Sequence, residues 1–251
     1  MISDSDLLRP DWSVSAQVRA LSTTRKGGVS QSPWQSLNLG GHVGDNSADV
    51  ARNRQRLASV MGIESGQIGW LNQVHGTRAV ELTSNNLNDC PDADASFTRE
   101  RGVVCAILTA DCLPVILADR SGAVVGAAHA GWRSLCGGVL ENLIEAMAVE
   151  PSELVAWFGP SIGPANFEVG PEVQAAFVEQ QAESASAFCT QGARPGHFIA
   201  DIYELARLRL TRAGVTDIHG GGLCTVGDSE RFYSYRRDGQ TGRMATLVWL
   251  D

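Results

Sequence analysis

The sequence predicts an α+β protein in which mixed β-sheets, built largely from hairpins, pack together and are flanked by helices. Short β-type runs are joined by turn residues, as in PVILA (114–118) and AVVGAA (123–128). Segments with apolar residues at helical spacing lie between such runs, as over residues 47–61 and 130–148. There is no linker with a shift in composition and no internal repeat, so we expect one domain over residues 1–251.

Composition narrows the class of protein. The chain has 251 residues, of which 43% are hydrophobic, and a formal net charge of −8. These values are typical of a globular protein with a buried core. The basic residues are scattered, whereas a nucleic-acid surface needs a basic stripe. A small phosphorylated or nucleotide-like ligand remains compatible, because two or three local arginines suffice for it.

The N-terminus and the cysteines indicate the compartment. The first residues lack the basic and apolar regions of a secretory signal. No window approaches the roughly 18 to 20 apolar residues that cross a membrane. Six cysteines without a close spacing pattern fit reduced thiols. We therefore expect a cytoplasmic protein with neither nucleic-acid nor membrane partners.

The N-terminal half alternates loops with short elements. Residues 1–20 are expected to form an edge segment of modest order. The glycine-rich stretch 22–46 matches neither the phosphate-loop nor the dinucleotide pattern, and is either a functional loop or a surface loop held by its own turns. A helix is predicted over Ser47–Met61. A strand starts at Ile68, and the acidic residues 85–96 are interpreted as a structural loop.

The second half continues this pattern. Residues 102–108 predict a buried strand, in which Cys105 is a small core residue. Residues 130–148 predict one helix, and the C-terminal residues 231–250 predict a hairpin. The remaining predicted elements are a strand over 155–158 and helices over 171–181 and 202–213.

The stretch Thr109–Ser134 carries the most chemistry, because it brings a thiol near an imidazole. If Arg120 and Ser121 form the hairpin loop, Cys112 faces His129 across the two strands. A bulged loop would shift the register by one residue and still leave both at the open end. Such a pair is either half of a metal site or a nucleophile with its base.

The five histidines differ in their surroundings. His197 and His219 lie in polar, glycine-rich stretches and are expected on the surface. His75, like Cys112 and His129, is embedded among apolar strand ends. A His/His/Cys set leaves a fourth position open, as in catalytic zinc sites. Because the spacings match no short zinc motif, core polar residues and a Cys–His nucleophile pair stay as alternatives.

Three segments resemble one family. NQVHGTRAV around His75, TADCLPVILAD around Cys112 and AAHAGWRSL around His129 are similar to the ligand motifs of the YfiH-type family, also called polyphenol oxidase or laccase-domain proteins. Its members are described as zinc-dependent purine nucleoside phosphorylases. The likeness covers essentially the whole chain, with further similar blocks at residues 23–45, 53–57, 157–170 and 232–245.

The resemblance implies a function and its residues. His75, Cys112 and His129 match the zinc ligands and are the expected catalytic centre, and Arg54 matches an arginine associated with the active site. The implied reaction cleaves adenosine, inosine, guanosine or methylthioadenosine with phosphate to give free base and ribose 1-phosphate, with adenosine deamination as a side activity. The expected partners are a purine nucleoside and phosphate, with the oligomeric state left open.

Arginines are the expected phosphate ligands. Arg133 follows His129 at the start of a predicted helix, where free backbone N–H groups favour an anion. Arg54, Arg236 and Arg243 complete the candidate set for substrate binding. For Arg236 and Arg243 the alternative is a solvated hairpin tip.

Other activities remain as alternatives. Five histidines without a His-x-His pair cannot hold a trinuclear copper cluster, although copper(II) can substitute for zinc at a single site. Ala165 and Asn166 stand where some relatives have cysteines, so no further thiol supports a second metal. The alternatives are a copper-dependent phenol oxidase, a Cys–His hydrolase that uses Cys112 on an amide of a cell-wall precursor, and a non-catalytic nucleoside-binding protein.

Overall fold

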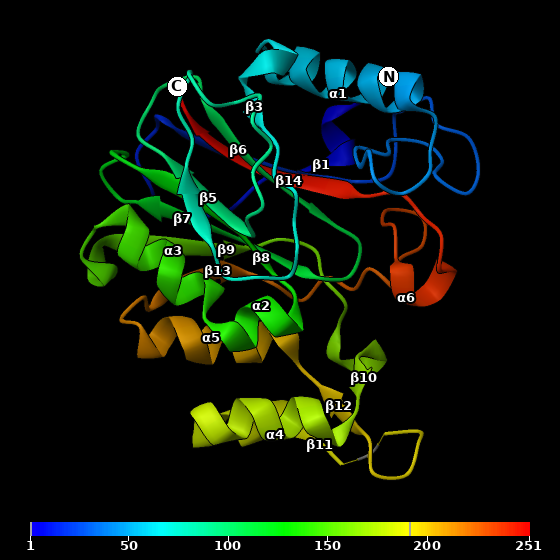
Figure 1. Ribbon diagram of the computed structural model, residues 1–251, viewed down its shortest axis with the longest axis vertical. Coiled ribbons are helices and arrows are strands. Elements are labelled where there is room, and N and C mark those ends of the chain that lie inside the picture. The colour runs from blue at the N-terminus through cyan, green and yellow to red at the C-terminus, as the bar shows by residue number, and fades with distance from the viewer. Residues whose placement is uncertain (1, 191) are drawn as a thin grey trace.

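A computed structural model describes residues 2–190 and 192–251. Two β-sheets pack face to face in the middle of the molecule (Figure 1). The first has the strand order β1 (Leu7–Leu8), β2 (Val18–Thr23), β14 (Met244–Leu250), β6 (Val104–Thr109) and β3 (Ile68–Gly69). The second has the order β13 (Asp217–Gly220), β9 (Leu154–Phe158), β7 (Leu113–Asp119), β8 (Val125–Ala130), β5 (Ala95–Thr98) and β4 (Ala79–Glu81).

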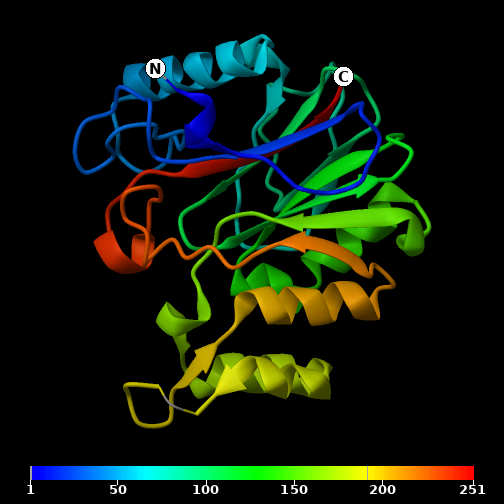
Figure 2. The same ribbon diagram turned by 180° about the vertical axis from the view of Figure 1, so that it is seen from behind.

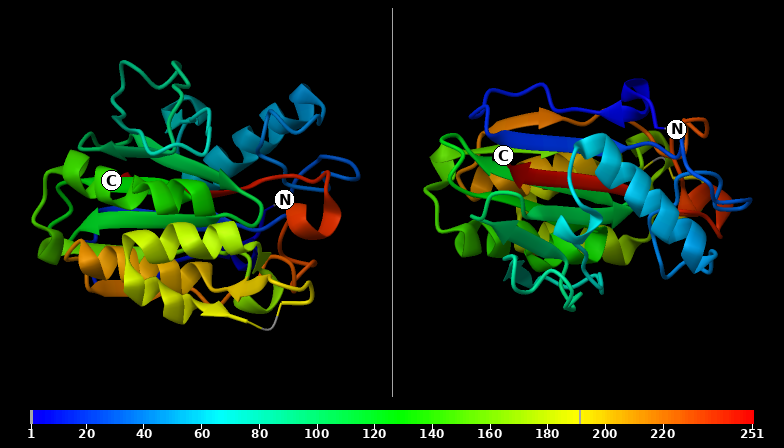
Figure 3. Two further views of the ribbon diagram at one scale, coloured as in Figure 1. Left: turned by 60° about the horizontal axis from the view of Figure 1, so that its bottom comes forward. Right: turned by 90° about the horizontal axis from the view of Figure 1, so that it is seen from above.

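Helices lie outside the two sheets, and some of them cover an outer sheet face. They are α1 (Ser47–Met61), α2 (Trp132–Gly137), α3 (Val139–Met147), α4 (Pro171–Gln180), α5 (Ile202–Arg212) and α6 (Tyr235–Asp238). Short 3₁₀ helices are η1 (Asp4–Asp6), η2 (Ser65–Gln67), η3 (Pro151–Glu153), η4 (Pro164–Asn166) and η5 (Ala182–Ala187). α1 lies across the first sheet, as the view from above in Figure 3 shows.

The hydrophobic core forms three layers between these elements. Side chains of β2, β6 and β14 meet those of β7, β8 and β9 between the two sheets. A second layer lies between the first sheet and α1, and a third between the second sheet and α2, α3 and α5. The predicted class, mixed sheets packed together and flanked by helices, is therefore confirmed.

A small layer extends the fold beyond α5. It consists of α4 and a three-stranded sheet in the order β10 (Glu168–Val169), β12 (Phe198–Ala200) and β11 (Phe188–Cys189) (Figure 2). Val173 and Phe177 of α4 are buried in the same core layer as α5. Within the described residues, no helix is long and apolar enough to cross a membrane.

Most predicted helices are present with small changes. α1 has the predicted bounds, begins after Asn46, whose side chain accepts a hydrogen bond from the Ala48 N–H, and ends at Gly62 with φ of 73°. The single helix predicted over 130–148 is wrong. Gly138 has φ of 100°, and this left-handed residue separates α2 from α3.

The register predicted for the central hairpin is wrong by two residues. Pro114, not Cys112, pairs with His129, and Ala118 pairs with Val125. The connection is longer than two residues because the Asp119 carboxylate accepts hydrogen bonds from the Ala123 N–H and the Ser121 hydroxyl. Cys112 therefore precedes the strand, although it still lies at the open end of the hairpin.

The C-terminal hairpin is also wrong. Residues 231–235 form no strand, and α6 begins where Ser234 accepts a hydrogen bond from the Arg237 N–H. β14 instead lies between β2 and β6, antiparallel to both. A fully buried strand needs partners on both edges, and segments distant in sequence supply them here. β2 is likewise internal, so only β1 of residues 1–20 forms the expected edge.

Candidate metal centre

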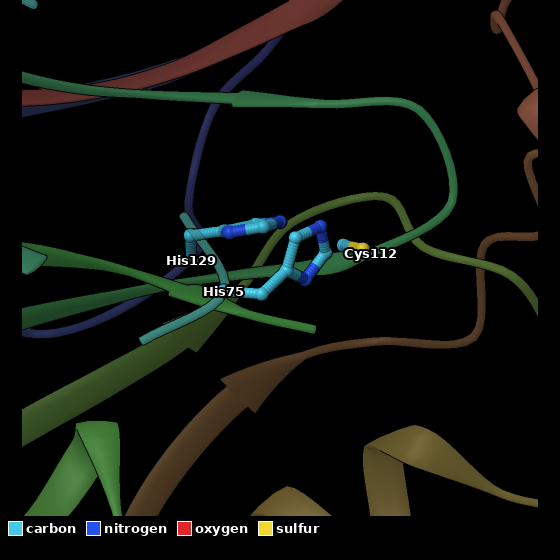
Figure 4. A group of neighbouring side chains, drawn as sticks. All are labelled: His75, Cys112 and His129. Atoms are coloured by element: carbon cyan, nitrogen blue, oxygen red, sulfur yellow. The ribbon is translucent and has the colours of Figure 1, made fainter. Parts of the chain in front are cut away.

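The chain crosses from the first sheet to the second between β6 and β7, and the candidate site lies at this crossing. Cys112 is on the crossing segment, directly after Asp111, which has φ of 97°. His129 is in β8, and His75 is on the loop between β3 and β4 with φ of 57°. Figure 4 shows the three side chains pointing toward one another. One ligand atom from each lies within 4.8 Å of the others.

Gly131 leaves room for this cluster. A Cβ atom at this position would lie 2.8 Å from His75 Nδ1 and 3.1 Å from Cys112 Sγ. The φ of Gly131 is −60°, which suits any residue, so space rather than conformation requires glycine. Two imidazoles and a thiolate at this separation fit a single zinc ion, and copper(II) takes the same donors. Nucleophile chemistry by Cys112 with His129 as base uses the same arrangement.

Asp94 organises both histidines from a fully buried position. Its Oδ1 lies 2.7 Å from His129 Nδ1 and accepts the His75 N–H at 3.0 Å. Its Oδ2 accepts the Val74 N–H at 3.1 Å and the Gly76 N–H at 2.6 Å. The loop 85–96 was predicted to be only structural, and this part of the prediction missed Asp94.

The electrostatics follow from burial and these contacts. Burial alone would raise the pKa of Asp94, but the hydrogen bonds from His129 and the backbone outweigh it and lower that pKa. Burial alone would lower the pKa of His129, but the negative charges of Cys112 and Asp94 raise it to about 9. Burial and the neighbouring His129 lower the pKa of His75. The two imidazoles are therefore in different electrostatic environments.

A cavity of about 580 Å³ opens beside the three side chains, and its volume suits a small organic ligand. One part of its wall is apolar or aromatic, from Trp132, Phe167, Tyr235, Ile162 and Ile202. The remaining wall is mainly polar and comes from loops, from the ends of β6 and β8, and from α2 and α6.

Three predicted arginines, Arg133, Arg236 and Arg243, line this cavity. In the described part of the chain, none of the ion pairs involves these three guanidinium groups. Arg243 is half-buried and donates to the carbonyls of Thr241 and Gly242 at 3.1 and 3.0 Å. Burial lowers its pKa. A half-buried arginine without a carboxylate partner is suited to an anionic ligand.

Arg54 lies elsewhere. Its guanidinium stacks 3.9 Å from the Trp70 ring centroid, and its Nε and Nη2 donate to the Leu39 carbonyl at 3.0 and 2.9 Å. Arg54 is not one of the described residues that line the cavity. Its catalytic and substrate-binding roles therefore stay predictions.

Sequence reasoning missed further residues of the cavity. His42 reaches it from the glycine-rich loop 22–46. Asp111 also lines it, and its carboxylate accepts the Thr225 hydroxyl at 2.6 Å and the Arg236 N–H at 2.7 Å. The one available signal was the position of Asp111 next to Cys112. His197 and His219, the latter in β13, are both half-buried, and neither belongs to the cavity lining among the described residues.

Comparisons with known proteins agree with this architecture. The family model described as multi-copper polyphenol oxidoreductase laccase matches residues 19–251. A purine nucleoside phosphorylase of Pseudomonas aeruginosa is 54% identical, over 97% of this chain and 98% of its own length. Purine nucleoside phosphorylase YfiH of Escherichia coli K12 is 48% identical, over 98% of this chain and 99% of its own.

Solved structures have the same fold. A Neisseria meningitidis protein matches with a TM-score of 0.92 and 51% identity, over 98% of this chain and 99% of its own. YlmD from Geobacillus stearothermophilus matches with a TM-score of 0.88 and 32% identity, over 100% of this chain and 98% of its own. The identities and the near-complete coverage lead to one assignment: the chain belongs to the YfiH-type, laccase-domain family.

Proposed function

We propose that this protein is a zinc-dependent purine nucleoside phosphorylase. One observation carries the proposal: a His/Cys/His donor set and three arginines free of carboxylate partners lie on the wall of one cavity. The donor set suits a catalytic metal, and the arginines suit phosphate. The names of relatives at 54% and 48% identity, both purine nucleoside phosphorylases, support the same reaction.

Phosphorolysis makes two demands on the cavity. Phosphate must be held beside C1′ of the sugar, and the purine must leave with its developing negative charge stabilised. Arg243 suits the first demand, since its half-buried guanidinium lines the cavity and forms no ion pair among the described residues. Arg133 and Arg236 add positive charge, and the aromatic wall with Trp132 suits a purine ring.

His75, Cys112 and His129 would hold the metal, which is zinc in this proposal, with copper(II) as a substitute. When bound, such an ion supplies Lewis-acid chemistry that can serve both phosphorolysis and adenosine deamination as a side activity. Arg54 supports the cavity indirectly in this scheme, because it fixes the Leu39 carbonyl in the loop that carries His42. All six cysteines are free thiols, which suits the cytoplasmic location that we propose.

The test combines metal content with product analysis. The purified protein should contain about one zinc per chain and convert adenosine, inosine, guanosine and methylthioadenosine with phosphate to free base and ribose 1-phosphate. The Cys112→Ala variant should lose zinc and activity, whereas Cys189→Ala, which alters an exposed thiol, should retain both. Full activity of Cys112→Ala would refute the assignment.

A Cys–His hydrolase is the second candidate, and one observation favours it. Asp94 hydrogen bonds to His129 at 2.7 Å, so Cys112, His129 and Asp94 also have the order of a nucleophile, a base and an orienting acid. This enzyme would act on an amide, such as one in a cell-wall precursor. Inhibition by thiol alkylation without inhibition by chelators would favour the hydrolase, and loss of activity on chelation favours the metal enzyme.

A further inference from the structure

We propose that Asp94 is a positioning residue of the metal centre, which fixes the His129 ring and the His75 backbone together. This inference rests on the metal site of the proposed function. The buried Asp94 carboxylate would then set the geometry of His129 and His75, two of the three metal donors, without being a donor itself.

The carboxylate determines which nitrogen of His129 faces the site. The Asp94 Oδ1 lies 2.7 Å from Nδ1 of His129, so in this geometry Nδ1 faces the carboxylate and Nε2 is left as the atom that faces the site. The His129 side chain is about 5% exposed and that of Asp94 is fully buried, so water does not compete for this hydrogen bond. Partners of this kind fix the ring orientation and tautomer of metal-binding histidines.

The same group fixes the loop that carries His75. Three consecutive N–H groups, those of Val74, His75 and Gly76, point at the Asp94 carboxylate. This arrangement accompanies the positive φ of His75, which a non-glycine residue adopts only where its surroundings stabilise it. Without the carboxylate, three N–H groups would lose their acceptor, and the loop would lose the contact that sets its position.

The main chain of Asp94 is held independently of its side chain. Its carbonyl accepts the His129 N–H at 2.6 Å, and its N–H donates to the Arg78 carbonyl at 3.1 Å. These contacts continue the pairing of β5 with β8, which starts at Ala95 opposite Ala128. Substitution of the side chain therefore leaves the strand pairing in place and removes the acceptor.

Asp94→Asn is the decisive variant. The asparagine side chain has the same shape, but one of the two oxygens becomes an NH₂ group, which cannot accept a hydrogen bond. One oxygen is then left for the four N–H groups that now reach the carboxylate. Loss of a partner of this kind typically weakens metal binding about 10- to 100-fold. We expect that weakening in the zinc dissociation constant of the stripped full-length protein, measured by competition with a chromophoric chelator. The cobalt(II) absorption spectrum should change as well, because the ligand geometry changes.

Asp119→Asn is the matched control. Asp119 is also a buried carboxylate at one end of β7, and it accepts the Ala123 N–H at the turn of the hairpin, away from the cavity. This variant should lose stability and keep the zinc dissociation constant of the wild type. A zinc dissociation constant for folded Asp94→Asn within about twofold of the wild type would overturn the proposal.

A second measurement needs no variant. With ¹¹³Cd bound to ¹⁵N-labelled wild-type protein, we expect coupling of the metal to Nε2 of His129 and a retained proton on Nδ1. Coupling to Nδ1 would overturn the proposal even if Asp94→Asn fails to fold. Both readouts report metal binding. If the zinc-loaded wild type releases no base from nucleosides while Asp94→Asn binds zinc more weakly, the proposed function fails and the role of Asp94 stands.

Discussion

The two walls of the cavity are built in different ways. Strand pairing and one buried aspartate fix the metal wall, where His129 lies within β8 and Cys112 directly precedes β7. Loops and the short helix α6 form another part of the lining, which we call the arginine wall, with His42, Tyr235, Arg236 and Arg243. Strand pairing restricts positions more than isolated side-chain contacts do. The comparison indicates that His129 and Cys112 are held by the sheet, that His75 on its loop is held by Asp94, and that the groups of the arginine wall have more freedom to adjust.

Removal of the metal should give the largest difference between the functions of the two walls. We expect a chelator to reduce phosphorolysis to background, because in the proposed function the ion held at the metal wall would supply the Lewis acid. Phosphate binding to the stripped protein, measured by calorimetry, should persist because the arginines do not depend on the ion. Restoration of activity by added zinc is the control. Loss of phosphate binding on chelation would contradict the independence of the two walls.

Gly131→Ala should have the second largest effect, which is a loss of zinc affinity at the metal wall. The new methyl group would lie 2.8 Å from His75 Nδ1. Overpacking of this kind costs about 1–3 kcal/mol, so zinc affinity should fall roughly 5- to 150-fold. Gly41→Ala is the matched control near His42, since no atom lies within 4 Å of its added Cβ. Equal zinc affinities of the two variants would show that the space at Gly131 is unimportant.

Arg243→Ala should weaken phosphate binding at the arginine wall and leave the metal wall unchanged. Hydrogen bonds to charged groups contribute about 1.5–3 kcal/mol, so the KM for phosphate should rise about 10- to 150-fold. The zinc content should stay at the wild-type value. Arg52→Ala, which removes an exposed arginine of α1, is the control for loss of positive charge. A fall in zinc content of Arg243→Ala would mean that the walls are coupled.

Tyr235→Ala should give the smallest effect. Tyr235 lines the cavity but is 62% exposed, so its ring can cover only one side of a ligand. An aromatic contact of this kind contributes about 0.5–1.5 kcal/mol, and the KM for adenosine should rise roughly 2- to 10-fold. An unchanged KM would place the purine away from α6.

The sequence predicted residues on both walls, since His75, Cys112 and His129 lie together and Arg133, Arg236 and Arg243 line the cavity. Local patterns identified β7, β8 and the α1 bounds, because apolar runs and helix ends depend on neighbouring residues. Cys105, predicted as a core residue, is fully buried. The pairing of β14 with β2 and β6 joins segments more than 200 and 130 residues apart, and no local pattern reveals such partners.

The same limit explains the missed site residues. Asp94 reaches His129 only because β5 pairs with β8 from a position 35 residues earlier. Arg243 was among the predicted arginines, although the pairing of Met244 with Thr109 that brings it beside the crossing segment was not predicted. The hairpin register failed because the Asp119 side chain stabilises a longer turn than the backbone pattern suggested. Each error concerns a contact made by a side chain or by distant segments.

Asp111 links two parts of the cavity wall. Its carboxylate accepts the N–H of Arg236, and its own peptide bond leads into Cys112. A displacement of the crossing segment at Cys112 would therefore also displace the backbone at the start of α6, so a ligand that moves one of these parts would move the other with it.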